Sequence, residues 1–135
     1  RTGLAVAVVN ALREQGQPVL FMRTLSIVTR IQETYSDVAT RSTDDILREF
    51  SGVAYLVIDE FTAENITNDR LEKIEQIIRE RDRRGLPTLY TTNHSIEEVY
   101  AKWGKRTGDI VAKAHWVEVG GVKLRQTVRK VAGAW

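Results

Sequence analysis

The sequence predicts an α/β domain built around a mostly parallel β-sheet with helices on both faces. Short apolar runs typical of buried strands alternate along the chain with amphipathic segments of helical period. The helices between successive strands are long enough for right-handed crossovers, which make neighbouring strands parallel. Because 135 residues fit one hydrophobic core, residues 1–135 are expected to form a single domain.

Helical and strand signals alternate in the first half of the chain. Apolar residues recur at three- and four-residue spacing from Thr2 to Gln15, which predicts a helix that stops at Gly16. The next elements are a strand at Val19–Met22 after Pro18, a helix from about Thr24 to Tyr35 with Thr24 as N-cap, a polar loop at 36–42, a short helix from Thr43, and a strand that ends at Asp59 and Glu60. The positions expected to face the core of the first two helices are Leu4, Ala7, Val8, Ala11, Leu12, Leu25, Val28 and Ile31.

Cap and turn residues divide the second half in the same way. Thr67 or Asn68 is expected to cap a long helix that ends at Gly85. The following elements are a strand at Pro87–Thr91, a helix capped by Ser95, a helix at Thr107–Ala114, and strands at His115–Val119 and Lys123–Val128 joined by a hairpin turn at Gly120-Gly121.

Polar side chains follow two successive predicted strands. Asp59 and Glu60 end the apolar run that begins at Leu56, and Asn93 follows the next strand. The carboxyl edge of a parallel sheet is where open α/β folds bind ligands, and an amide beside two acids can hold an attacking water. Two plainer readings stay open: an ordinary acidic loop after the strand, and Asn93 as a turn residue beside the helix cap Ser95.

Composition excludes several classes of protein. The chain has no cysteine and two scattered histidines, so a disulfide framework and a zinc cluster are not expected. It contains no apolar stretch of membrane-spanning length, and its start lacks the layout of a signal peptide, which predicts a soluble, cytoplasmic protein. The net charge of +2 says little, but the basic residues cluster, and local clusters can steer an anionic partner. They are Arg79, Arg81, Arg83 and Arg84 at the end of the long helix, and Lys123, Arg125, Arg129 and Lys130 near the C-terminus.

The order of motifs resembles that of a known family. YLVIDE, the helix LEKIEQIIRERDRRG and PTLYTTN together resemble the Walker B to sensor 1 segment of the AAA+ ATPases. GLAVAVVNALREQGQPVLFM, TLSIVTRIQETY and TTNHSIEEVYAKWGKRTGDIVAKA extend the resemblance to the bacterial replicative helicase loaders of the DnaC/DnaI type and the related IstB transposition helper ATPases. The resemblance covers nearly the whole chain and implies a P-loop NTPase (AAA+) three-layer sandwich.

The resemblance also implies roles for individual residues. Asp59 and Thr2 would bind Mg²⁺, and Glu60 would act as the base that polarises the water attacking the γ-phosphate of ATP. Asn93 would position that water. Arg125, in a partial match to a Gly-x-Ser-x-Arg ending, would sense the nucleotide.

The chain departs from the family pattern at two places. Arg1 stands where the family has the P-loop lysine, and the glycine-rich loop and its strand are absent, so a fragment beginning at the end of the Walker A motif is expected. Without that strand the sheet should have a central gap, and this chain alone should be inactive. Ile110 stands where a neighbouring subunit's arginine is expected, so Arg106 is the nearest candidate, with Lys113 behind it; a solvated helix-end charge is the plainer reading of Arg106.

The function implied by the resemblance is ATP-dependent loading of a replicative helicase onto single-stranded DNA, by a homo-oligomer joined through its ATP sites. The arginines that close the long helix are explained by its dipole alone, whereas Trp116 or Trp135 beside the C-terminal cluster could stack on a base. The alternatives are an IstB-like ATPase that assists a transposase on duplex DNA, and a degenerate, non-hydrolysing binding module, which Arg1 and Ile110 favour.

Overall fold

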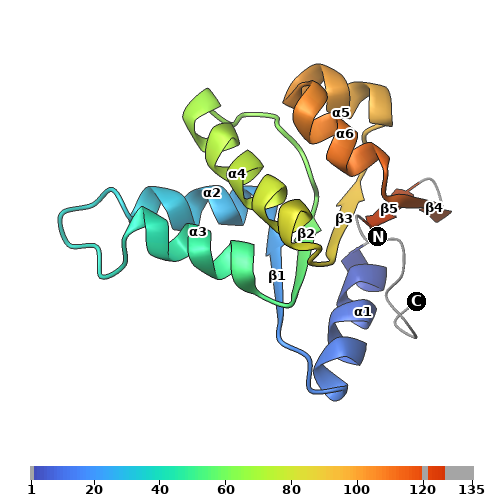
Figure 1. The fold of residues 1–135 in the computed structure, drawn as a ribbon, viewed down its shortest axis with the longest axis horizontal. Helices are drawn as coiled ribbons and strands as arrows, with labels where there is room; N and C mark the ends of the chain where they lie inside the picture. The colour runs from blue at the N-terminus through green and yellow to red at the C-terminus, as the bar shows by residue number, and fades with distance from the viewer. Residues whose placement is uncertain (1, 120–121, 127–135) are drawn as a thin grey trace.

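The structure, a computed structural model, describes the backbone of residues 2–119 and 122–126 and the side chains of residues 3–114. The described elements confirm the predicted order, with ends shifted by a few residues (Figure 1). They are α1 (Thr2–Glu14), β1 (Val19–Arg23), α2 (Thr24–Glu33), α3 (Thr43–Gly52), β2 (Tyr55–Asp59), α4 (Asn68–Arg84), β3 (Thr88–Thr92), α5 (Ile96–Trp103), α6 (Lys105–Ala112), β4 (His115–Val119) and β5 (Val122–Gln126).

The five strands form one sheet in the order β1-β2-β3-β5-β4. β1, β2 and β3 are parallel, with Phe21 opposite Val57 and Val57 opposite Leu89. β4 and β5 are antiparallel to each other, as a hairpin requires, although its predicted turn at 120–121 lies outside the described residues. The α/β class is therefore confirmed, with an antiparallel pair completing a parallel core.

The expected central gap in the sheet is not found. β5 pairs antiparallel with β3 along Leu89–Thr92, so the edge of β3 that would have been open carries a ladder. An unpaired strand edge leaves backbone donors and acceptors without partners, and the C-terminal hairpin satisfies them here.

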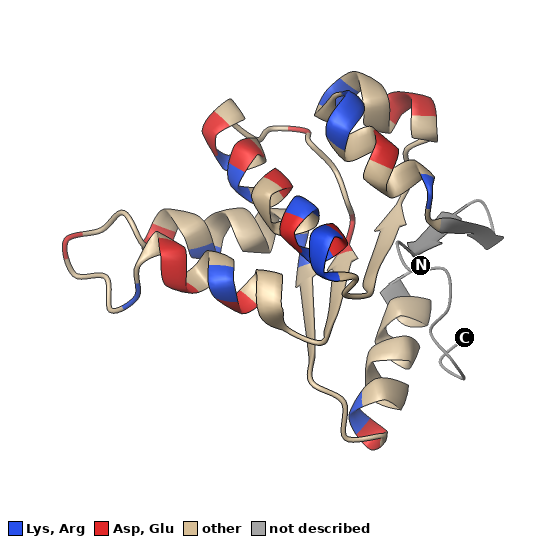
Figure 2. Cartoon of the chain, in the orientation of Figure 1, with Lys and Arg blue, Asp and Glu red and all other residues tan. Residues whose placement is uncertain are grey.

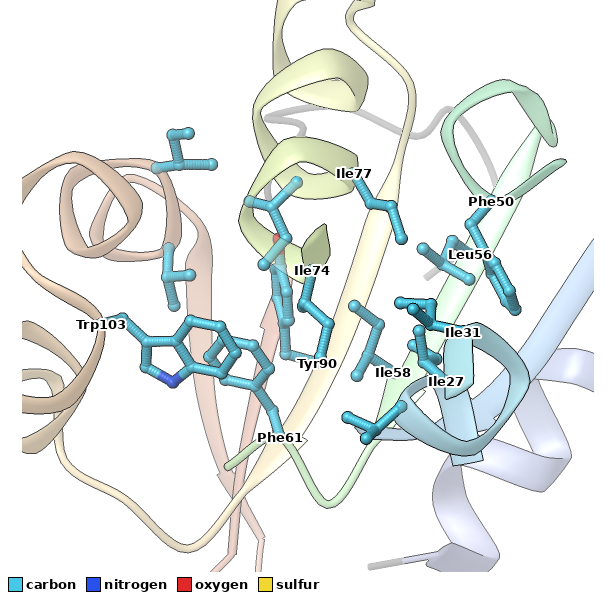
Figure 3. Packing of buried hydrophobic residues seen from close by; sticks show 14 of the residues in the cluster. Ile27, Ile31, Phe50, Leu56, Ile58, Phe61, Ile74, Ile77, Tyr90 and Trp103 are labelled. Carbon is cyan, nitrogen blue, oxygen red and sulfur yellow. The ribbon is translucent and has the colours of Figure 1, made fainter. Parts of the chain in front are cut away.

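Helices cover both faces of the sheet, giving three layers (Figure 1). On one face, α1 packs Ala5 and Val9 against Val57 and Leu89. On the other, α2 to α6 enclose the larger cluster, in which Leu56, Ile58 and Tyr90 of the sheet meet isoleucines of α2 and α4 (Figure 3). Neighbouring strand residues thus point to opposite faces, as the pleat requires. The predicted helix–sheet–helix sandwich is confirmed.

The predicted core-facing positions of the first two helices are confirmed in part, since Leu12, Val28 and Ile31 are buried. Leu4 is 38% exposed and Leu25 is 50% exposed, although both were expected in the core. The buried positions of α1 are Ala5, Val9 and Leu12. A helix with apolar residues at several adjacent positions has a wide apolar stripe. Its periodicity therefore does not determine which part of the stripe faces the sheet, and the buried positions can differ from the predicted ones by one residue.

Local end signals are confirmed for α4 and α5. Ser95 caps α5 in a capping box with Glu98, and Gly85 ends α4 in the left-handed conformation with φ of 68°. Thr67 is the N-cap residue of α4, without a side-chain cap bond. Within the described residues, no helix has the length and apolar content needed to cross a lipid bilayer.

Arg81 is one of the arginines explained above by the dipole of the long helix alone, but its side chain is fully buried. Its guanidinium donates to Thr88 Oγ1 at 2.8 Å and to the carbonyl oxygens of Phe50 at 3.0 Å and Pro87 at 2.7 Å. The carbonyl oxygens of Val53 and Ala54 accept two further bonds. Arg81 therefore joins the end of α4 to the segments that lead into β2 and β3. Burial lowers its pKa to about 10.

Candidate functional site

The two polar strand ends lie side by side. β2 and β3 are parallel neighbours with Ile58 opposite Tyr90, so the residues that follow, Glu60 and Asn93 among them, leave the sheet at the same edge. α1 runs in the opposite direction to these strands, which places its first turn towards that edge (Figure 1). The predicted juxtaposition of the acidic and amide ends is confirmed.

Thr91 fixes the two acids relative to each other. Its hydroxyl donates to Asp59 Oδ1, and it accepts the backbone N–H of Glu60 at 2.9 Å. Asp59 and Thr91 are both buried, whereas Glu60 is exposed. One hydroxyl from β3 thus orients the buried carboxylate and the backbone of the exposed one.

The backbone of Glu60 is held in an unfavourable conformation. Its φ is 51°, which a bulky L-residue rarely adopts. Thr24 donates to the Glu60 carbonyl at 3.1 Å and accepts the N–H of Thr62 at 3.3 Å. Thr24 is therefore a buried bridge to the loop after β2, and the predicted N-cap assignment is wrong: the N-cap of α2 is Arg23. A strained backbone conformation persists only where several surrounding contacts hold it in place, and such conformations are typical of functional sites.

Glu60 and Asn93 line one pocket of about 400 Å³. Phe61, Thr62, Glu64 and His94 complete its wall. Asn93 lies in the bend between β3 and α5, directly before the loop that leads to the N-cap Ser95, so the plainer reading of Asn93 as a turn residue beside this cap stays open. The Asn93 side chain is exposed and makes no hydrogen bond within the described side chains. Glu60 also borders a hollow of about 200 Å³ against Arg23 and Ser26.

His94 was not singled out from the sequence, yet it links the two sides of this pocket. Its Nδ1 lies 3.1 Å from Glu98 Oε2, and its Nε2 lies 3.3 Å from Thr62 Oγ1. The four-residue spacing from His94 to Glu98 was the available signal. The hydrogen bond from the Ser95 backbone, followed by that from His94, lowers the pKa of Glu98 to about 2.

The remaining predicted site residues lie elsewhere. Arg106 is on α6 in a groove with Arg79 and Ile110, and this groove shares no lining residue with the Glu60 pocket. The groove therefore brings Arg106 together with none of the residues that line the Glu60 pocket of its own chain. Arg1 lies outside the described part of the chain, and so do the side chains of Thr2, of Arg125 and the rest of the C-terminal basic cluster, and of the two tryptophans proposed to stack on a base.

The donor groups at the strand ends fit Mg²⁺. Magnesium prefers oxygen ligands and is usually held by one or two carboxylates together with substrate phosphates and water. Asp59 supplies such a carboxylate, and Thr91 already orients it. No group of three or more His, Asp or Glu side chains able to hold a metal without such co-ligands occurs among the described residues.

Known proteins with similar sequences are helicase loaders. The replicative helicase loader DnaC of Escherichia coli strain K12 is 33% identical over 108 residues, which cover 78% of this chain and 43% of that protein. The DnaC proteins of Escherichia coli O157:H7 and Shigella flexneri match to the same extent. No family model matches the chain. The chain spans less than half the length of these relatives. The resemblance to the bacterial replicative helicase loaders is therefore confirmed over most of the chain, together with the α/β architecture that it implies.

Proposed function

We propose that the protein carrying this chain is an ATP-dependent loader of a replicative helicase onto single-stranded DNA. The observation that carries the proposal is the placement of Glu60 and Asn93 in one pocket at the carboxyl edge of β2 and β3. Similarity to DnaC supports the helicase as partner over a transposase. The proposal includes Mg²⁺ and ATP as ligands, assembly of several copies and a cytoplasmic location.

Each side chain at the edge has a proposed task. Asp59, with Thr2, would hold Mg²⁺, which when bound neutralises charge on the phosphate oxygens. Glu60 would accept a proton from the attacking water, and Asn93 would orient that water from the adjacent strand. The strained backbone of Glu60, fixed by Thr91 and Thr24, would keep its carboxylate in position without reorganisation.

Three more residues have proposed tasks. The side chains of two of them lie outside the described part of the chain, and the third would act on another subunit. Arg1 stands at the position of a phosphate-binding lysine, and Arg125 would sense the nucleotide in the same subunit. Arg106 would act on the nucleotide of a neighbouring copy, consistent with its groove sharing no lining residue with the Glu60 pocket.

Turnover of ATP by the full-length protein tests the proposal. Glu60→Gln should lower turnover by about 100-fold or more, since a general base contributes that much, while binding of a fluorescent ATP analogue is retained. Glu97→Gln is the matched control, because Glu97 is an exposed acid at the start of α5. A helicase-loading assay on single-stranded DNA should lose activity in parallel.

Two results would contradict the proposal. If the full-length protein neither binds nor hydrolyses ATP, the degenerate binding module is the better description. If Glu60→Gln and Glu97→Gln have equal turnover, the acid at the end of β2 is not the base.

A further inference from the structure

The loop that follows β2 is joined to the β3–α5 region by a series of contacts. The Phe61 carbonyl oxygen accepts the Thr92 hydroxyl at 2.9 Å, and the buried Phe61 ring stacks on Trp103 of α5 with ring centroids 4.7 Å apart (Figure 3). These contacts fix the loop as far as Phe61. The next residue, Thr62, is half-buried and lines the Glu60 pocket.

His94 carries this series of contacts past Phe61. Its side chain is 15% exposed and lies between the start of α5 and Thr62. Because a carboxylate only accepts, the N–H at Nδ1 donates to Glu98 Oε2 at 3.1 Å, and Nε2 of the neutral ring accepts the Thr62 hydroxyl at 3.3 Å. The Thr62 oxygen in turn accepts the Glu64 backbone N–H at 3.0 Å. One directed chain of hydrogen bonds therefore runs from Glu64 through Thr62 and His94 to Glu98.

Glu98 gives this chain of hydrogen bonds a fixed end. Its other carboxylate oxygen accepts the Ser95 backbone N–H at 3.1 Å in the capping box, so the carboxylate is held by the first turn of α5. Acidic residues lie both in this turn and in the loop after β2 (Figure 2), and His94 Nε2 is 4.0 Å from Glu64 Oε1. Both ring nitrogens of His94 are engaged within the chain, which suits a side chain that holds its neighbours in place.

We propose that His94 is a positioning residue for the Glu60 pocket. Its bond to Thr62 keeps the loop after β2 against the bend that carries Asn93, so the Glu60 carboxylate and the Asn93 amide keep a fixed separation in one pocket. A small displacement of groups that orient reactants lowers the rate strongly. The effect on a reaction rests on the proposed function, whereas the tie between the loop and α5 does not.

The test compares substitutions of His94 in the full-length protein. The side-chain amide of Gln reaches the position of Nε2, whereas that of Asn reaches only the position of Nδ1. His94→Ala and His94→Asn should each lower kcat for ATP hydrolysis by about 5- to 10-fold, the effect of losing roughly one hydrogen bond. KM should stay unchanged, because no residue assigned to the phosphates or Mg²⁺ is altered. His94→Gln should restore most of the loss.

Tyr100→Phe is the matched control, because it also removes one hydrogen bond of α5, the one to Asp109 at 2.6 Å, and neither residue lines the Glu60 pocket. Its kcat should equal that of the wild type.

Substitutions of Thr62 test the same bond from the other side. Thr62→Val removes the hydroxyl and should lower kcat as His94→Ala does, while Thr62→Ser keeps the hydroxyl and should match the wild type. The double variant His94→Ala/Thr62→Val should lose no more than either single variant, because both remove one shared interaction. Losses that add in full would contradict the proposal.

Hydrogen exchange provides a readout that does not need ATP. The backbone amides of residues 62–66 should exchange faster in His94→Ala than in Tyr100→Phe, because the loop opens more readily without its tie to α5. If His94→Ala matches Tyr100→Phe in both exchange and kcat, the proposal is wrong. Faster exchange with an unchanged kcat, or equal restoration by Asn and Gln, would also overturn it. Should the wild type lack turnover, the proposed function fails by its own assay, while exchange still decides whether His94 holds the loop.

Discussion

Replacing Arg81 by methionine should lower the free energy of unfolding by about 3–5 kcal/mol, because several buried oxygen atoms lose their hydrogen-bond donor together. Methionine fills much of the volume but donates no hydrogen bond. The carbonyl oxygens of Phe50, Val53 and Pro87, among others, would lose their donor. Each buried polar group left without a partner costs about 1–3 kcal/mol, and removal of a buried cation offsets part of this.

Arg83→Met is the matched control, on the same helix two residues along the chain. The Arg83 side chain is 70% exposed and bonds only Glu80 among the described residues. An exposed ion pair contributes about 1 kcal/mol or less, so this variant should unfold close to the wild type. Arg81→Lys should also destabilise the protein clearly, because an ammonium has three donors and no planar fork.

Urea denaturation followed by far-UV circular dichroism measures these differences, with an unchanged dependence on urea as the check that the same transition is observed. If Arg81→Met and Arg83→Met lose stability to within about 1 kcal/mol of each other, the buried hydrogen bonds of Arg81 do not hold the fold together, and the reasoning is refuted.

Three further predictions follow from single contacts. Thr91→Val removes the donor to Asp59 and leaves the Glu60 N–H without its acceptor, so ATP turnover by the full-length protein should fall by about 10-fold or more. The control is Thr29→Val, on the exposed side of α2. Equal turnover in the two variants would show that Thr91 does not orient the acids. Since the pKa of Glu98 is lowered to about 2, the stabilising effect of its carboxylate is complete above the unfolded pKa near 4.5 and is lost as the pH falls from 4.5 towards 2. In Glu98→Gln the melting temperature should therefore fall less steeply between these two pH values than in the wild type. An unchanged dependence of the melting temperature on pH would contradict this. Gly108→Ala should lower the free energy of unfolding by about 1–3 kcal/mol, measured by urea denaturation, because a Cβ at this position would overlap the Tyr100 ring. Gly3→Ala is the control, since a Cβ there meets open space, and it should be neutral or stabilising. Equal effects of the two substitutions would rule out the overlap.

Much of the fold followed from local signals. Ser95 begins α5 and Gly85 ends α4 because their own chemistry satisfies helix ends, whatever lies elsewhere in the chain. The juxtaposition of Glu60 and Asn93 also followed, since parallel neighbouring strands end at one edge of a sheet.

Other features depended on contacts that no local pattern records. Arg81 is one of four arginines at the end of α4 with similar sequence surroundings, and only its fit against Phe50 and Pro87 makes it the buried one. The pairing of β5 with β3 likewise depended on which strand was free to complete the sheet.

The sequence by itself thus determined the alternating helices and strands, their ends, and the edge of the sheet where the acids and the amide meet. Only the tertiary structure decided which polar side chains hold that edge in place. Thr24 and Thr91 bond residues more than thirty positions away in the chain, 36 positions for Thr24 to Glu60 and 31 for Thr91 to Glu60. Periodicity and capping act over a turn or two of helix, whereas a hydrogen bond of this kind exists only once separate elements have packed together.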